Sequence, residues 1–207
     1  WWNRPGFEVY DGIICDGSIR SGKTVSMTDG FILWSMSRFN GQSFAICGKT
    51  IESLRRNVIT LMPQWLEGIF SITERRSENK LIITSGGVTN SYYMFGGKDE
   101  SSYTLVQGIT LAGVLFDEVA LMPRSFVEQA MARCSVAGSK FWFNCNPENP
   151  GHWFYVEWIK KARERNILYL HFTMDDNLSL APEIKARYEG MYTGVFYRRY
   201  ILGLWVK

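Results

Sequence analysis

The fold of this chain is decided by the stretch Gly17-Ser18-Ile19-Arg20-Ser21-Gly22-Lys23-Thr24, which reads G-x-x-x-x-G-K-T. An apolar run around Ile13 and Ile14 precedes the stretch, and residues 25–39 can form a helix after it. This strand–loop–helix order is the context of a phosphate-binding P-loop, in which backbone N–H groups at a helix N-terminus surround nucleotide phosphates. We therefore expect an α/β protein in which all eight residues bind a nucleotide.

Two side chains of the P-loop have specific chemistry. Lys23 would reach the β- and γ-phosphates, and the Thr24 hydroxyl would bind Mg²⁺. A glycine turn before an ordinary core helix is the simpler alternative. That alternative becomes weak because a second motif downstream fits the same chemistry.

The second motif is Gly113-Val114-Leu115-Phe116-Asp117-Glu118, an apolar run that ends in two acids. Such a run is typical of a buried central strand, and the carboxyl edge of the sheet is where ligands bind. Asp117 would hold Mg²⁺ through water, and Glu118 would polarise the water that attacks the γ-phosphate. A solvated Asp-Glu turn is the alternative. With the P-loop upstream, the acid pair favours an ATPase over a GTPase or a small-molecule kinase.

The third site follows an expected strand at Lys140–Asn144. A polar residue at the end of the strand beside the acid-bearing one can contact the γ-phosphate and transmit its hydrolysis. Asn146 is the first candidate for this sensor, and Asn144 is the second. The alternative is an Asn-Pro turn whose side chains satisfy their own backbone.

Length and composition fit a single globular domain over residues 1–207. Hydrophobic residues make up 46% and charged residues 21%, which excludes a disordered chain. The net charge of +3 is too small to indicate nucleic-acid binding by itself. The four cysteines form no C-x-x-C pair, so we expect reduced thiols in a cytosolic protein. No apolar run reaches about 18 residues, so we expect no membrane span, and we see no signal peptide.

Helix and strand signals alternate, which predicts a mostly parallel sheet with helices on both faces. Pieces at 70–75, 80–84 and 91–95 are separated by Asn79 and Gly86-Gly87, and we expect antiparallel hairpins there. Thr50 is expected to cap an amphipathic helix that runs to Trp65. The other expected strands are 9–16, 42–48, 112–117, 140–144 and 168–173, and the other expected helices are 123–133, 152–165, 182–192 and 195–202.

Further pieces of the chain accompany the three sites: Phe95–Glu100, Asn146-Pro147 followed by His152-Trp153-Phe154, Asp176-Asn177, and Arg198–Trp205. Together they resemble the ATPase domain of the large terminase subunit of tailed phages, the motor that pumps DNA into a procapsid. The resemblance covers nearly the whole chain in the right order. Many ATPases share the P-loop and the acid pair, whereas the Arg20 loop and the Leu-Gly-Leu-Trp ending are more specific.

The resemblance implies an additional-strand, RecA-like P-loop NTPase that hydrolyses ATP with Mg²⁺ to translocate double-stranded DNA. It also implies a ring on the capsid portal, with the portal protein and the small terminase subunit as partners, in the host cell cytoplasm and away from membranes. In the family a nuclease domain of ribonuclease H type follows the ATPase domain. Since the chain stops at Lys207, we expect no nuclease activity in it. The family's adenine-reading glutamine has no counterpart in residues 1–16.

Several basic residues could add charge to the site. By resemblance, Arg20 would sense the γ-phosphate within its own subunit; the alternative is a solvent-facing arginine. An arginine finger from a neighbouring subunit is also expected in a ring, and Lys98, Arg124 and Arg133 are open candidates. Three basic clusters could contact the DNA backbone or simply be solvated: Arg55-Arg56, Arg75-Arg76, and Lys160-Lys161 with Arg163 and Arg165.

Two other functions stay open at this point. One is a helicase, although the 207 residues show no second helicase-like core. The other is a module that binds ATP for assembly with little turnover. Glu118 argues against such a module, because a protein without turnover needs no base.

Overall fold

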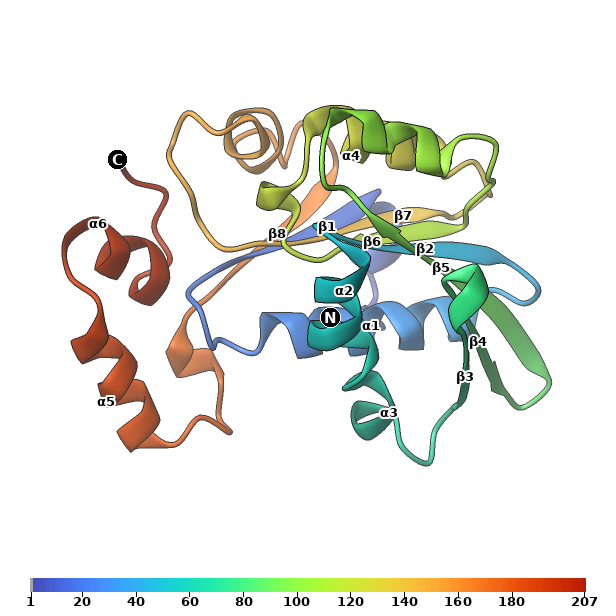
Figure 1. Cartoon of the computed structure of the whole chain (residues 1–207), viewed down its shortest axis with the longest axis horizontal. Coiled ribbons are helices and arrows are strands. Elements are labelled where there is room, and N and C mark those ends of the chain that lie inside the picture. The colour runs from blue at the N-terminus through green and yellow to red at the C-terminus, as the bar shows by residue number, and fades with distance from the viewer. Residues whose placement is uncertain (1) are drawn as a thin grey trace.

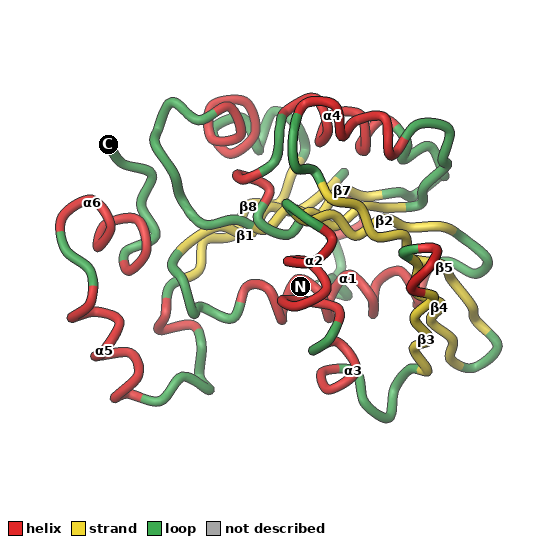
Figure 2. The backbone as a smooth tube through the Cα atoms, in the orientation of Figure 1, coloured by secondary structure: helices red, strands yellow, loops and turns green. Residues whose placement is uncertain are grey.

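The computed structural model describes residues 2–207 and places eight strands in one sheet (Figures 1 and 2). Across the sheet the order is β3-β4-β5-β2-β6-β7-β1-β8. Strands β5, β2, β6, β7, β1 and β8 run parallel, and β3 and β4 add antiparallel strands beside β5. The predicted fold class is confirmed. The strands are Gly12–Gly17 (β1), Ser43–Gly48 (β2), Ser71–Arg75 (β3), Lys80–Ser85 (β4), Val88–Gly96 (β5), Gly113–Phe116 (β6), Lys140–Asn144 (β7) and Ile167–Phe172 (β8).

The central strands bring the three sequence motifs to one edge of the sheet. Every residue of β1 and of β6 is buried, as central strands of a parallel sheet covered on both faces should be. In the register, Cys15 lies opposite Asn144, and Phe116 lies opposite Phe143. The P-loop, Asp117 and Asn144 therefore all lie at the carboxyl ends of three strands that are side by side in the sheet, β1, β6 and β7.

Helices cover both faces of the sheet (Figure 1). On one face, Phe31 and Trp34 of α1 pack against the sheet, and the Phe31 ring meets Trp142 edge to face at 5.6 Å. On the other face, α4 buries Phe126 and Val127 in a second core. The α-helices are Lys23–Arg38 (α1), Ile51–Leu54 (α2), Met62–Trp65 (α3), Arg124–Ala132 (α4), Pro182–Met191 (α5) and Gly194–Phe196 (α6).

The expected helix from Thr50 to Trp65 is broken into three pieces. Its start is as predicted, because Thr50 and Ser53 form a reciprocal capping box. A π-helical turn, Arg55–Ile59 (η2), then replaces the α-helix, and Thr60 N donates to Arg55 O at 2.9 Å. Pro63 lies in the first turn of α3 and has no N–H, so the chain restarts a helix there instead of continuing one.

Other boundaries differ in the same way. The expected helices at 152–165 and 195–202 contain π-helical turns, Tyr155–Ile159 (η6) and Tyr197–Ile201 (η8). The hairpins are confirmed: Asn79 has a φ of 47°, and Gly86 and Gly87 have φ of 54° and 85°, as tight hairpin turns require. The remaining short turns are Phe7–Val9, Arg76–Glu78, Glu100–Val106, Val119–Leu121 and Met174–Asp176.

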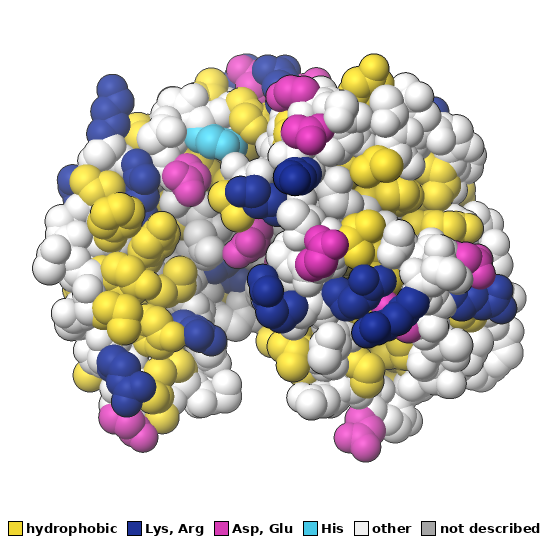
Figure 3. Space-filling view, in the orientation of Figure 1, with side chains coloured by type: hydrophobic (Ala, Val, Ile, Leu, Met, Phe, Trp, Pro, Cys, Tyr) yellow, Lys and Arg dark blue, Asp and Glu magenta, His cyan; other side chains and the backbone are white. Residues whose placement is uncertain are grey.

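The segment after β8 forms a separate lobe at the edge of the sheet (Figure 1). Helix α5 buries none of its residues, and hydrophobic side chains gather over α5 and α6 on the molecular surface (Figure 3). Within residues 2–207, no helix is long and apolar enough to cross a membrane. All four cysteines are free, and burial raises the pKa of the Cys15, Cys47 and Cys145 thiols.

Candidate nucleotide-binding site

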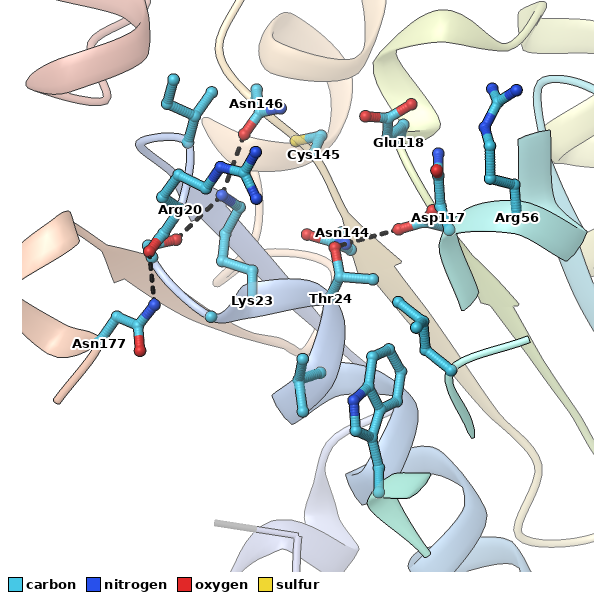
Figure 4. Close-up of a pocket in the computed structure, with 17 residues that line it drawn as sticks. Arg20, Lys23, Thr24, Arg56, Asp117, Glu118, Asn144, Cys145, Asn146 and Asn177 are labelled. Carbon is cyan, nitrogen blue, oxygen red and sulfur yellow. Dashed lines mark hydrogen bonds between the residues drawn. The ribbon is translucent and has the colours of Figure 1, made fainter. Parts of the chain in front are cut away.

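The P-loop connects the end of β1 to the start of α1 (Figure 4). Gly17 has a φ of 134°, and a Cβ there would lie 1.8 Å from the carbonyl oxygen of Phe172. Glycine is required because the loop passes directly against β8. Gly22 has a φ of 82° and immediately precedes α1. Both glycines of the motif therefore have a backbone conformation that other residues rarely adopt.

Lys23 is buried at the centre of the loop, with 6% of its surface exposed. Its Nζ donates to Ser18 O at 2.6 Å, to Ser21 Oγ at 3.1 Å and to Asn146 Oδ1 at 3.0 Å. Burial lowers the pKa of the ammonium from its usual value, and nearby acidic groups oppose the shift. The structure thus brings together the predicted phosphate-binding lysine and the first predicted sensor residue, Asn146.

Asn144 joins the two predicted metal-binding residues. Its Nδ2 donates to Asp117 Oδ1 at 2.7 Å and to Thr24 Oγ1 at 3.2 Å. Asn144, the second sensor candidate, therefore lies on the metal side of the site, and Asn146 lies on the Lys23 side. The sequence did not reveal this division, because Asn144 is the last residue of the strand that Asn146 follows.

The residues around Asp117 fit a divalent cation. Asp117 is 7% exposed, and burial, with a further contribution from the charge of Glu118, raises its pKa to about 7. Asn144 Oδ1 is buried and has no hydrogen-bond partner in the described chain. A carboxylate, a hydroxyl and an amide oxygen are the hard donors that Mg²⁺ prefers. A cation here would compensate a buried negative charge that the protein leaves poorly neutralised.

Glu118 has a left-handed backbone, with φ 57° and ψ 50°. This conformation is uncommon for residues other than glycine and is enriched at functional sites. Glu118, Asp117 and the P-loop line one cavity of about 530 Å³. Sequence reasoning did not assign seven of the residues that line this cavity to the site: Val25, Arg56, Asn57, Leu61, Trp65, Cys145 and Asn177. Only Arg56 had been considered for function, as part of a cluster that could contact DNA.

Arg20 lies at the edge of the same cavity and is held by α5. Its Nε donates to the Tyr188 hydroxyl at 3.0 Å, and its guanidinium lies 5.3 Å from the centre of the Tyr188 ring. Asn177 Nδ2 donates to the carbonyl oxygen of Arg20 at 2.8 Å. The lobe after β8 thus supports the P-loop from outside. The predicted role of Arg20 at the γ-phosphate stays a prediction.

A buried acid anchors the base of the P-loop. Asp16 is fully buried and accepts hydrogen bonds from Tyr169 Oη at 2.8 Å, His171 Nδ1 at 2.8 Å and Trp205 Nε1 at 2.7 Å. Because a carboxylate only accepts, His171 Nδ1 is the donor, and this hydrogen bond raises the pKa of His171. Gly203 packs so closely that a Cβ there would lie 2.8 Å from Ser18 N. The Leu-Gly-Leu-Trp ending therefore braces the P-loop.

The other predicted cations lie elsewhere. Lys98, Arg124 and Arg133 do not line the cavity, and Arg124 pairs with Glu128 at 2.7 Å. Their role as fingers for a neighbouring subunit stays a prediction. Several members of the basic clusters form ion pairs within the chain: Arg55 with Glu74, Arg75 with Glu78, Arg76 with Glu74, and Lys161 with Glu157.

Comparison with protein families gives one match over residues 14–207, to the model described as terminase large subunit, T4likevirus-type, N-terminal. Among curated proteins, none matches the chain.

Solved structures of the large terminase from a thermophilic bacteriophage are similar along the whole chain. Crystal form 2 of that terminase has 59% identity and a TM-score of 0.95, and the match covers 100% of this chain and 51% of that one. The complex of the same terminase with ADP has 57% identity and a TM-score of 0.95, and the match covers 51% of that chain. The complex with ATP-gamma-S has 56% identity and a TM-score of 0.93, and the match covers 50% of that chain. Both cover 100% of this chain. The chain thus spans about half the length of these relatives.

A more distant similarity concerns the fold alone. The ATPase domain of the Thermus phage P74-26 large terminase, solved as an arginine-to-alanine point mutant, has 15% identity and a TM-score of 0.61. That match covers 90% of this chain and 85% of the other.

Proposed function

Because this chain belongs to the family of phage large terminase subunits, whose N-terminal part it matches, we propose that its cavity binds ATP with Mg²⁺ and hydrolyses it to ADP and phosphate. The observation that carries the proposal is the convergence on one cavity of Lys23, at the start of α1, with Asp117 and Glu118, which directly follow β6. The terminase of the thermophilic bacteriophage was solved with ADP and with ATP-gamma-S, which supports adenine nucleotides as ligands.

Each side chain has a defined task in this reaction. Lys23 would exchange the oxygens of Ser18, Ser21 and Asn146 for the β- and γ-phosphate oxygens, which are stronger partners for an ammonium. Asp117 and Thr24 would hold Mg²⁺, which when bound neutralises charge on those oxygens.

Glu118 would act as the general base. It would take a proton from the water whose oxygen attacks the γ-phosphorus. The bond from the γ-phosphorus to the β–γ bridging oxygen breaks, and ADP leaves with that electron pair. Asn146, bonded to Lys23, would register the loss of the γ-phosphate. Residues 1–207 would act as one ATPase domain, since all eight strands join one sheet.

We assign the free energy of hydrolysis to translocation of double-stranded viral DNA into a procapsid. Family membership supports this function and favours it over a helicase or an assembly module with little turnover. The subunit would act in a ring docked on the portal, with the small terminase subunit as a further partner, in the host cell cytoplasm. The DNA contacts would be to the phosphate backbone, because a translocating motor must accept any sequence.

A phosphate-release assay with and without duplex DNA tests the proposal. The wild-type protein should release phosphate in a Mg²⁺-dependent reaction. Glu118→Gln should keep nucleotide affinity in calorimetry and lose turnover by at least about 100-fold, because an amide cannot accept the proton. Equal turnover in the two proteins would contradict the assignment of the base.

A further inference from the structure

Three cations line the cavity, and two of them have partners. The Lys23 ammonium is bonded to loop oxygens, and the Arg20 guanidinium is held by Tyr188. The third, Arg56, is exposed and makes no hydrogen bond or ion pair with any residue of the described chain. An arginine that lines an anion-binding cavity without a partner is free to bind the ligand.

The fold keeps Arg56 separate from its neighbour Arg55. Arg55 Nε donates to Glu74 Oε1 at 2.8 Å, and Arg55 Nη2 donates to Asn79 Oδ1 at 3.2 Å, so this side chain is fixed to the β3–β4 hairpin. Val58 and Ile59 of the same π-helical turn are buried in the core. The contacts of these three side chains hold the turn in place, and Arg56 of the same turn lines the cavity. Turns of this type often occur at functional sites.

Arg56 shares its side of the cavity with the catalytic acids. Figure 4 shows Arg56, Asp117 and Glu118 together on the side of the site away from Arg20. Arg56 and Glu118 form no ion pair, and the Glu118 carboxylate has no hydrogen-bond partner in residues 2–207. Two unpartnered groups of opposite charge thus line the cavity in which the attacking water and the γ-phosphate would meet. A guanidinium suits this position because its planar array of donors matches phosphate oxygens.

We propose that Arg56 is a catalytic residue that donates hydrogen bonds to the γ-phosphate of ATP bound in the same chain. This role rests on the proposed ATPase function. Arg56 transfers no proton; it stabilises the negative charge on the phosphoryl group while the bond to ADP breaks. The Arg56 guanidinium would act alongside any arginine finger supplied by a neighbouring subunit. Arg56 would then take part in ATP hydrolysis and not in DNA contact.

Nucleotide affinities separate this role from a structural one. Arg56→Ala should weaken ATP-gamma-S binding by about tenfold and leave ADP binding within about twofold, because only the triphosphate has the group that Arg56 contacts. Turnover should fall by about 10³-fold, the low end for such arginines, and Arg56→Lys should restore part of it. The matched control is Arg4→Ala, which removes another exposed arginine whose side chain has no hydrogen-bond or ion-pair partner in residues 2–207 and does not line the cavity; it should change none of these values.

Three outcomes overturn the proposal: equal losses of ADP and ATP-gamma-S affinity, no change in either affinity, or full turnover in Arg56→Ala. If Arg56→Ala does not fold, Arg56→Gln provides the same comparison with a polar side chain of similar length. Failure of the wild-type protein to bind either nucleotide would instead refute the proposed ATPase function.

A mixing experiment tests whether Arg56 acts within its own chain. Arg56→Ala and Glu118→Gln proteins are mixed in equal amounts and assayed for phosphate release. Each site would lack one of the two groups if both come from the same chain, so the mixture should stay as inactive as its components. Recovered turnover would show that Arg56 reaches a neighbour's nucleotide, and it would overturn the proposal.

Discussion

Replacing Asp117 by asparagine should stabilise the nucleotide-free protein and at the same time damage its site. The wild-type carboxyl is 7% exposed, and it ionises at the cost of desolvation and of repulsion by Glu118. An asparagine carries no charge and keeps an oxygen that can accept the hydrogen bond from Asn144. The wild-type protein without a bound cation has a free-energy cost from this poorly compensated buried charge, and the asparagine removes that cost.

The size of this penalty follows from the pKa. Folding raises the Asp117 pKa from 3.8 to about 7, and one pKa unit corresponds to about 1.4 kcal/mol, so the full penalty is about 4 kcal/mol. The folded protein binds this proton more tightly than the unfolded chain. Wild-type stability consequently falls as pH rises from about 4 to about 7, and it stays lower above that range. The Asp117→Asn protein has no free-energy cost of ionising this carboxyl at any pH.

Urea unfolding without nucleotide and with a chelator present measures the effect. The gain in unfolding free energy of Asp117→Asn over wild type should be larger at about pH 8 than at about pH 5 by roughly 3 kcal/mol. Glu164→Gln, which changes an exposed acid, is the control and should show no such pH-dependent gain. A gain that is equal at both pH values, or larger at the lower one, would refute the reasoning about Asp117.

Three further predictions concern the support of the P-loop and the core. Trp205→Phe removes the N–H that donates to buried Asp16 and should lower the unfolding free energy by about 2 kcal/mol, with denaturation as the readout; unchanged stability would mean that the bond is not formed. Gly97→Ala should cost about 1–3 kcal/mol, because the new Cβ would lie 2.4 Å from Phe126 Cδ1. Gly190→Ala, with nothing within 4 Å, should instead be neutral or stabilising. An NMR pH series should give His171 a pKa above the usual value, and this pKa should be lower in the Asp16→Asn protein, because the hydrogen bond to Asp16 favours the protonated ring. The hydrogen bond stabilises the fold fully below the pKa of His171 in the unfolded chain, and this stabilisation is lost as the pH rises through the pKa of the folded protein.

Local sequence signals predicted the parts of the site that are local in the chain. The P-loop, the acid pair after β6 and the bounds of β7 follow from short motifs and apolar runs, because burial between two helical layers imposes those runs. Hairpin turns at Asn79 and at Gly86-Gly87 were likewise readable from residue type.

Contacts between distant segments were not predictable in this way. The bond from Trp205 to Asp16 joins residues 189 positions apart, and the bond from Arg20 to Tyr188 joins residues 168 apart. The π-helical turn that contains Arg55 and Arg56 also left no mark on the apolar spacing, which fits a continuous α-helix almost as well. Arg56 consequently read as one half of a basic pair, and only the fold distinguishes it from its neighbour.

Binding of ATP-gamma-S with Mg²⁺ to wild-type and Lys23→Ala proteins, measured by calorimetry, tests most directly whether this cavity is a nucleotide site. Lys23 donates its buried ammonium to loop oxygens that phosphate oxygens would replace, so its loss should weaken binding by at least about 100-fold. The account predicts a saturable titration for the wild type and no measurable heat for Lys23→Ala at the same concentrations. Equal affinities in the two proteins would contradict it.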